Sequence, residues 1–216
     1  MKKLVIFDLD GTLLDTIADL TNATNYALVK HGFPTHEKHK YKYFVGSGAE
    51  TLIRKALPEG TPKEIFDKVK KDFIEQYTIH ASAKTAPYSG IVEMLKTLEE
   101  KGIKMAIASN KPHHKTEKVV AHYFSEIRFQ VVFGHRTGYN PKPDTQIVND
   151  ILNELKIEKS DTLYVGDSSI DMQTAKASGL YAIGCSWGFR TREELLEHGA
   201  DAIINSPEEL IPIVME

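Results

Sequence analysis

Residues 4–12 read LVIFDLDGT: four apolar residues, then the acids Asp8 and Asp10 on either side of a leucine, then Gly11 and Thr12. An uninterrupted apolar run of this length is typical of a strand that is buried on both faces of a parallel sheet. Ligands of open α/β sheets bind outside the carboxyl ends of the strands. The two acids therefore predict the edge of the sheet at which a functional site would lie.

Short apolar runs recur along the chain, and segments with a helical period separate them. The expected strands are residues 4–7, 104–108, 130–133, 162–165, 181–184 and 202–204. The expected helices include residues 89–98, with Ser89 as a candidate N-cap, and residues 112–124, 144–155 and 169–178. This alternation predicts an α/β fold whose core is a doubly wound, Rossmann-like parallel sheet.

One part of the chain interrupts the alternation. Between the first expected strand and Tyr88, about seventy residues have helical periods and no convincing strand. The clearest helix there has Thr61 as a candidate N-cap, Pro62 as its first residue and Glu64 in position to complete a capping box. We therefore expect an inserted helical cap domain, residues 16–80, and a core domain formed by residues 1–15 and 81–216.

Composition excludes several classes of protein. The chain has 216 residues, 41% of them hydrophobic and 26% charged, which is typical of a folded globular protein. A net charge of −3 gives no basic footprint for nucleic acid, and no apolar run is long enough for a membrane span or a signal peptide. The lone Cys185 cannot form an internal disulfide, which suits a reducing compartment. We expect a cytoplasmic protein that binds neither nucleic acid nor membranes, as a monomer or weak homodimer.

Polar residues that could take part in catalysis or binding follow other expected strands. Ser109 and Asn110 follow the strand at 104–108, and Asp167 and Asp171 follow the strand at 162–165. Lys142 lies in a loop bounded by prolines, directly before an expected helix. The carboxyl ends of parallel strands meet at one edge, so these groups would gather around the two acids of the first strand. Because close carboxylates repel one another, a bound Mg²⁺ would relieve the conflict.

The order of these groups resembles the four motifs of the haloacid dehalogenase superfamily of aspartate-dependent phosphatases. In this chain the motifs are DLDGT at residues 8–12, Ser109 at a strand end, Lys142, and GDSSID at residues 166–171. The resemblance extends over the whole chain. The helical insert directly after the first motif is similar to the mobile cap of the phosphoglycolate phosphatase and β-phosphoglucomutase branch. A phosphatase with a helical cap is therefore the expected class.

The resemblance implies a catalytic role for four residues. Asp8 would be the nucleophile that forms an aspartyl phosphate, and Asp10 would be the general acid and base. Ser109 and the neighbouring backbone amides would hold the phosphoryl oxygens, and Lys142 would balance their charge.

The same resemblance implies Mg²⁺ as the cofactor. The metal would be bound by the carboxylate of Asp8, the backbone carbonyl of Asp10 and Asp167. Asp171 would act indirectly, through a water on the metal or by orienting the lysine.

A small phosphoester is the expected substrate and partner. Its expected contacts are Gly11, Thr12 and Asn110 in the core and Gly46, Ser47, Gly48 and Arg54 in the cap. The cap segment 45–57, VGSGAETLIRKAL, is similar to the substrate-facing loop and helix of phosphoglycolate phosphatases. Backbone amides near its glycines would form an anion nest, and Arg54 would pair with a carboxylate. A small anionic phosphoester such as 2-phosphoglycolate is what the resemblance implies.

Two other functions stay open at this point. A phosphosugar mutase of the β-phosphoglucomutase type would use the same core and return the phosphoryl group to a second hydroxyl. A non-catalytic protein would hold a phosphoryl ligand without turnover, but a pure binder gains nothing from clustered negative charge. The complete acid pair, Asp8 and Asp10, therefore favours an enzyme.

Overall fold

The computed structural model describes residues 1–80 and 83–216, which form two compact units. The α/β core comprises Met1–Leu14 and Pro87–Glu216, and the helical insert comprises Asp15–Ala86. The first division therefore lies one residue before the predicted boundary at 15/16. The predicted second boundary, at 80/81, falls at residues 81 and 82, which lie outside the described residues.

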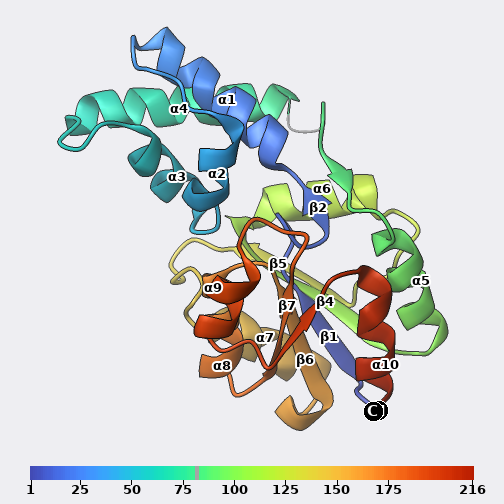
Figure 1. Ribbon diagram of the computed structural model, residues 1–216. Helices are drawn as coiled ribbons and strands as arrows, with labels where there is room; N and C mark the ends of the chain where they lie inside the picture. The colour runs from blue at the N-terminus through green and yellow to red at the C-terminus, as the bar shows by residue number, and fades with distance from the viewer. Residues whose placement is uncertain (81–82) are drawn as a thin grey trace. The chain divides into compact units, whose positions relative to one another are not determined.

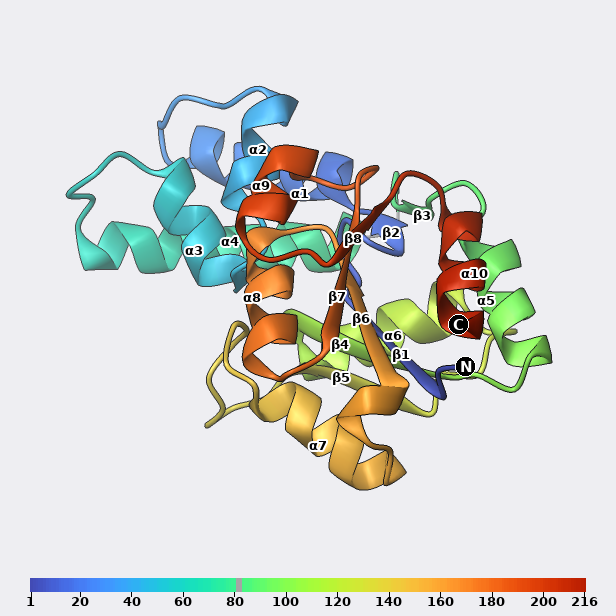
Figure 2. The same ribbon diagram turned by 60° about the horizontal axis from the view of Figure 1, so that its bottom comes forward.

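A six-stranded sheet forms the centre of the core (Figures 1 and 2), and its neighbouring strands pair in parallel. The strand order is β5-β4-β1-β6-β7-β8, so the chain moves first to one side of β1 and then to the other. The strands are β1 (Leu4–Phe7), β4 (Lys104–Pro112), β5 (Val131–His135), β6 (Thr162–Gly166), β7 (Tyr181–Cys185) and β8 (Ala202–Ile204). The predicted doubly wound parallel sheet is confirmed.

Helices cover both faces of this sheet (Figure 1), because alternate residues of β1 point to opposite sides. On one face, Val5 and Phe7 belong to a cluster of buried side chains that includes residues of three helices: α5 (Ile91–Glu100), α6 (His113–Tyr123) and α10 (Leu210–Met215). On the other face, Leu4 and Ile6 belong to a second cluster, with residues of α7 (Gln146–Leu155), α8 (Ser169–Ala177) and α9 (Arg192–Glu197). Two 3₁₀ turns, η1 (Lys159–Asp161) and η2 (Pro207–Glu209), complete the core.

The N-cap of one core helix differs from the sequence prediction. The N-cap of α5 is Gly90 and not Ser89, because the backbone there adopts a left-handed φ of 82°, which glycine tolerates best. The start of α8 was not predicted in detail. Ser168 and Asp171 form a capping box there, in which each side chain bonds the other residue's backbone N–H.

Four helices make up the insert: α1 (Ile17–Lys30), α2 (Lys38–Phe44), α3 (Gly48–Ala56) and α4 (Lys63–His80). Their apolar stripes face one another, with Leu28, Ile53 and Val69 fully shielded from solvent. The predicted capping box at the start of α4 is wrong. The helix begins at Lys63, so Pro62 precedes its first residue, and the Thr61 hydroxyl donates to the carbonyl of Pro58 at 2.7 Å.

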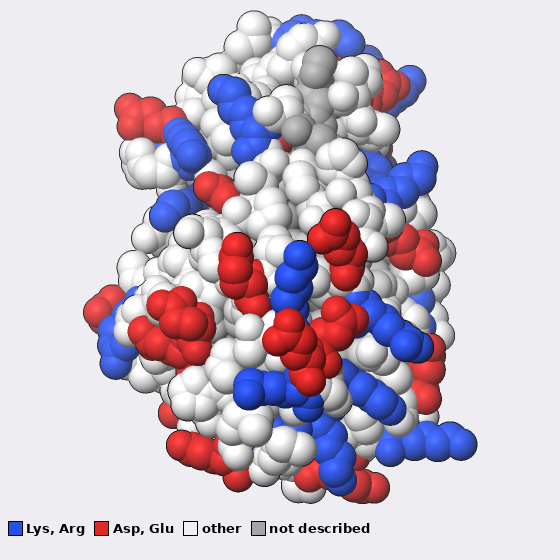
Figure 3. All heavy atoms as spheres, turned by 90° about the vertical axis from the view of Figure 1, so that its right-hand side faces the viewer, with Lys and Arg blue, Asp and Glu red and all other residues white. Residues whose placement is uncertain are grey.

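Two very short strands, β2 (Leu14–Asp15) and β3 (Ala86–Pro87), pair with each other where the chain passes between the units. Sequence patterning expected no strand in this part of the chain, because two residues are too few to show a period. Within residues 1–80 and 83–216, no helix combines the length and the hydropathy that crossing a bilayer requires. Acidic and basic side chains are interspersed on the face that Figure 3 shows.

Candidate active site

The strand order brings three acids together at the carboxyl edge of the sheet. β1 and β6 are neighbours with Phe7 opposite Val165, so Asp8 and Asp167, which follow these strands, lie side by side. One carboxylate oxygen from each of Asp8, Asp167 and Asp171 lies within 4.8 Å of the others, and all three residues are buried. The structure therefore assembles the acids that the sequence placed at separate strand ends.

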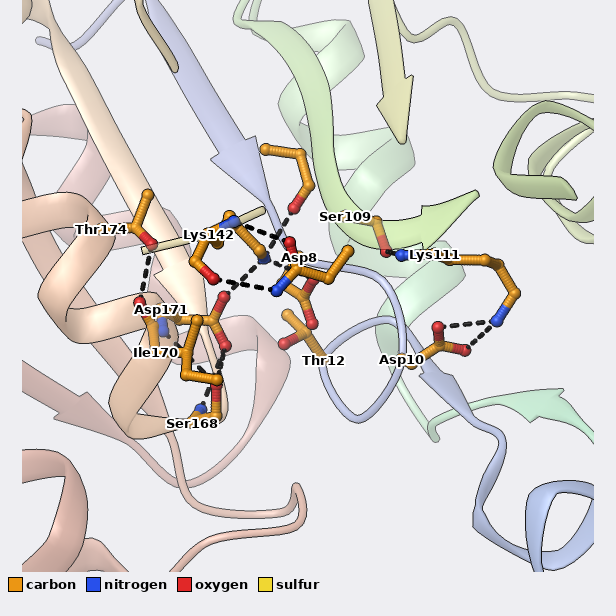
Figure 4. A network of polar contacts seen from close by, with 12 residues as sticks. Asp8, Asp10, Thr12, Ser109, Lys111, Lys142, Ser168, Ile170, Asp171 and Thr174 are labelled. Carbon is orange, nitrogen blue, oxygen red and sulfur yellow. Dashed lines mark hydrogen bonds and ion pairs between the residues drawn. The ribbon is translucent and has the colours of Figure 1, made fainter. Parts of the chain in front are cut away.

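Lys142 is the cation at the centre of this group (Figure 4). Its Nζ lies 2.7 Å from Asp8 Oδ1 and 2.7 Å from Asp171 Oδ1. The same ammonium donates to the carbonyl of Ala108 at 2.8 Å and to the hydroxyl of Tyr164 at 3.0 Å. Tyr164 was missed by sequence reasoning, because a tyrosine within an apolar strand resembles core packing. A buried ammonium bound on four sides has a fixed position.

Asn110 holds the loop that carries Lys142. Its Oδ1 accepts from the backbone N–H of Lys142 at 2.8 Å, and its Nδ2 donates to the Lys142 carbonyl at 3.2 Å. The predicted contact of Asn110 with substrate is not tested by these bonds. They give the side chain a structural task, because they join the end of β4 to the loop before α7.

Both carboxylate oxygens of Asp171 accept hydrogen bonds from other residues of the core. Oδ1 accepts from Lys142 and from the Tyr164 hydroxyl at 3.2 Å, and Oδ2 accepts from the Ser168 hydroxyl at 2.5 Å. Gly166 makes room for this side chain, since a Cβ there would lie 2.3 Å from Asp171 Cβ. Asp171 thus orients the lysine and caps α8 at once.

Asp167 is packed between two loops. Its Oδ2 accepts from the backbone N–H of Phe189 at 2.7 Å, and its Oδ1 accepts from the Thr12 hydroxyl at 3.3 Å. A Cβ on Gly11 would lie 2.3 Å from Asp167 Oδ2. Gly11 and Thr12, which we expected to contact substrate, therefore lie against an acid of the cluster and position it. Gly188 has the same effect from the other side and was not singled out in the sequence.

We predict that Gly188→Ala impairs the site. The new Cβ would lie 2.2 Å from Asp167 Cβ and 2.6 Å from the Gly11 carbonyl, so Asp167 must move. Overpacking of this kind costs about 1–3 kcal/mol in unfolding free energy, and displacement of a catalytic group by about 1 Å lowers turnover by about 10²-fold. Gly102→Ala is the control for turnover alone, because nothing lies within 4 Å of its Cβ position, although its φ of 73° makes alanine destabilising there as well. Equal activity in both variants would contradict the prediction.

Three carboxylates facing one ammonium leave an excess of negative charge. Burial raises the pKa of Asp8 to about 7, although Lys142 opposes the shift. Burial also raises the pKa of Asp167 well above its ordinary value, and the charges of Asp171 and Asp8 add to this. Burial acts to lower the pKa of Lys142, but the neighbouring Asp171 and Asp8 carboxylates raise it well above its ordinary value. Oxygen ligands with surplus negative charge suit a divalent cation.

Without a divalent cation, we predict that the protein loses stability as the pH rises from about 4 to about 8. Folded Asp8, with its raised pKa, binds a proton in this range that the unfolded chain releases, so deprotonation favours unfolding. The contribution is on the order of 4 kcal/mol. Urea unfolding in EDTA at several pH values measures it, and Mg²⁺ should restore stability mainly at the upper end. Asp8→Asn is the control, and an identical pH slope in that variant would contradict the prediction.

Asp10 is held by a residue that sequence reasoning missed. Its two carboxylate oxygens lie 2.8 and 2.7 Å from the Nζ of Lys111. The only signal for Lys111 was its place two residues after Ser109, at the same strand end. Ser109 itself is buried, and its Oγ accepts from the backbone N–H of Lys111 at 3.2 Å.

The predicted cap residues lie together in the insert. Gly46 and Gly48 have left-handed φ angles of 119° and 84°, and Ser47 is the N-cap of α3. Arg54 pairs with Glu50 on its own helix at 3.1 Å and stacks over the Phe66 ring at 4.7 Å. The predicted role of these residues in binding substrate stays a prediction.

Cys185 is a buried residue of β7, as expected of a small apolar side chain. Its Sγ lies 4.0 Å from the Thr12 hydroxyl. Burial raises the pKa of this thiol well above its ordinary value, which favours the protonated form.

The strand ends described above lie within a part of the chain that matches the sequence model of one protein family. The model of haloacid dehalogenase-like hydrolases matches residues 5–185, which include Asp8, Lys142 and Asp167. The chain belongs to this family, and it is an enzyme of the hydrolase class.

Individual relatives narrow the class further. Phosphoglycolate phosphatase 1 of Pseudomonas aeruginosa is 33% identical over 221 residues, which cover 98% of this chain and 79% of the relative. The crystal structure of a Lactobacillus delbrueckii protein, predicted to be a phosphoglycolate phosphatase, has a TM-score of 0.94, 32% identity and 99% coverage of both chains. N-acetylmuramic acid 6-phosphate phosphatase of P. aeruginosa is 28% identical over 215 residues, with coverages of 98% and 94%. The chain is thus similar to phosphatases named for different substrates.

Proposed function

We propose that the chain is a Mg²⁺-dependent phosphatase that hydrolyses a small phosphomonoester through an aspartyl phosphate. The observation that carries the proposal is the position of Asp8. Its carboxylate is buried at the end of β1, Lys142 contacts one oxygen, and Asp167 and Asp171 lie within 4.8 Å. A carboxylate so placed is shielded from bulk water and oriented by a fixed cation, as a nucleophile requires.

The chain's residues would divide the chemistry into two displacements. An oxygen of Asp8 bonds to phosphorus while the bond from phosphorus to the leaving oxygen breaks, and Asp10 donates a proton to that oxygen. Asp10 then takes a proton from water as the water oxygen attacks phosphorus and the bond to Asp8 breaks. Lys142 balances charge at Asp8, and the buried Ser109 hydroxyl is available to bind a phosphoryl oxygen.

The metal site would comprise Asp8, Asp167 and the backbone carbonyl of Asp10. When bound, Mg²⁺ would neutralise the clustered carboxylates and the phosphoryl oxygens. Both side chains are acceptors in a cluster with surplus negative charge, so the residues present fit a divalent cation.

We infer that 2-phosphoglycolate is the substrate to test first. Support comes from the relatives named phosphoglycolate phosphatase and from Arg54, whose guanidinium would pair with a carboxylate. The named N-acetylmuramic acid 6-phosphate phosphatase relative makes that sugar phosphate the second ester to test.

The test is release of inorganic phosphate from p-nitrophenyl phosphate, 2-phosphoglycolate and several sugar phosphates, with Mg²⁺ and with EDTA. We expect phosphate release that EDTA abolishes and Mg²⁺ restores. Undiminished turnover in EDTA would remove the metal from the mechanism. An isomerised sugar phosphate without free phosphate would select a mutase, and binding without turnover would select a phospholigand-binding protein.

We predict that Arg54→Ala raises KM for 2-phosphoglycolate at least about tenfold and changes KM for p-nitrophenyl phosphate much less. Only the first ester carries a carboxylate for the guanidinium to pair with. Lys70→Ala is a matched control, because Lys70 also contacts Glu50 (3.6 Å) and the Phe66 ring (5.3 Å). Equal changes for both esters would mean that Arg54 serves the structure of the insert alone.

A further inference from the structure

Lys111 forms a largely buried ion pair with Asp10. Its Nζ reaches both carboxylate oxygens, at 2.8 and 2.7 Å, across 101 positions of the sequence. The lysine side chain is only 6% exposed and the aspartate side chain 14%. An ion pair this sheltered is weakly screened by salt, unlike the exposed pairs on the helix surfaces.

Hydrogen bonds at both its N–H and its carbonyl hold the backbone of Lys111. Its N–H donates to Ser109 Oγ at 3.2 Å, and its carbonyl accepts from Thr116 Oγ1 at 3.2 Å. The register of β4 against β5 shifts between Ala108 and Pro112, which is where Lys111 lies. Gly134 permits this close passage, since a Cβ there would lie 2.5 Å from the Lys111 carbonyl oxygen. The lysine is thus built into the end of the strand.

Lys111 and Lys142 serve different acids. In Figure 4, Lys142 and Asp171 lie on one side of Asp8, and Lys111 and Asp10 lie on the other. Lys142 contacts Asp8 and Asp171, and Lys111 contacts Asp10. Asp8 and Asp10, the two acids expected to act on the phosphoryl group, therefore each contact the ammonium of a different lysine.

We propose that Lys111 is a positioning residue, which holds the Asp10 carboxylate in the one orientation that serves proton transfer. The proposal rests on the proposed function, which assigns Asp10 the role of acid and base. Contact with both oxygens restricts the two side-chain torsions of Asp10 to one arrangement. One oxygen can exchange a proton with the leaving group or water while the ammonium stays on the other.

The experiment measures kcat and KM for Lys111→Met with saturating Mg²⁺, on 2-phosphoglycolate and on p-nitrophenyl phosphate. An alkoxide leaving group needs protonation more than a nitrophenolate does. We expect kcat to fall at least about tenfold for the alkyl ester and less for the aryl ester, with KM within about threefold of wild type. Lys111→Arg, which keeps a bidentate cation, should recover part of the loss.

A double-mutant cycle with Asp10→Asn separates positioning from substrate binding. If Lys111 acts through Asp10, Lys111→Met causes no further loss in the Asp10→Asn background. Lys176→Met is the matched control, because it removes a lysine from a 2.8 Å pair with Asp201 elsewhere in the core. Lys111→Gln replaces Lys111→Met if the methionine variant does not fold.

Equal losses for both esters, a change in KM alone, or multiplicative losses in the cycle would overturn the role of Lys111 while leaving the phosphatase intact. A wild-type protein that releases phosphate from neither ester would overturn the proposed function, and the role of Lys111 with it.

Discussion

Asp8→Asn is expected to lower kcat by at least about 10⁴-fold while the chain stays folded. An amide is a poor nucleophile toward phosphorus, and it also supplies a weaker ligand for a cation. Asparagine has nearly the same shape, and Lys142 keeps its contacts with Asp171, Ala108 and Tyr164, so the surrounding structure has no reason to rearrange. Phosphate release and circular dichroism measure the two parts of the prediction.

Asp161→Asn is the matched control for this variant. Asp161 accepts from Lys3 at 2.6 Å in an exposed pair, so the substitution changes a paired carboxylate away from the site. It should leave turnover unchanged. If Asp8→Asn retained activity within about tenfold of wild type, Asp8 would not be the nucleophile.

Lys142→Met is the second substitution with a large expected effect. It removes the ammonium that contacts two buried carboxylates, and breaking a buried ion pair from one side costs about 3–5 kcal/mol. Charge balance at Asp8 is lost at the same time, so turnover should fall by at least about 10²-fold. Because the deficit is one of positive charge, Mg²⁺ should restore part of the stability of this variant and little of its activity.

Chemical denaturation with EDTA and with Mg²⁺ measures this effect. The control is Lys176→Met, whose pair with Asp201 is partly exposed and should contribute no more than about 1 kcal/mol. A Lys142→Met protein as stable as this control would show that the carboxylates do not depend on Lys142.

Sequence patterning was most successful for the sheet. All six expected core strands are present. Asp8, Asp10 and Asp167 follow the ends of β1 and β6, as the alternation predicted, and Asp171 lies in the first turn of α8. Apolar runs and helical periods depend on neighbouring residues alone, so they can be read from the sequence without knowing the tertiary contacts. Sequence patterns did not predict β2 and β3, because strands of two residues are too short to show an alternation. They also gave the wrong N-cap for α5, because the left-handed backbone at Gly90 determines where that helix begins.

The sequence by itself therefore determined the class of fold, the edge that carries the site and the acids gathered there. Only the tertiary structure decided which cation serves which acid, with Lys142 between Asp8 and Asp171 and Lys111 on Asp10. It also decided that Gly11 and Gly188 enclose Asp167. The physical reason is that such contacts join residues far apart in the sequence. Strand register, a bulge and the absence of a Cβ set them, and none of these leaves a periodic trace in the chain.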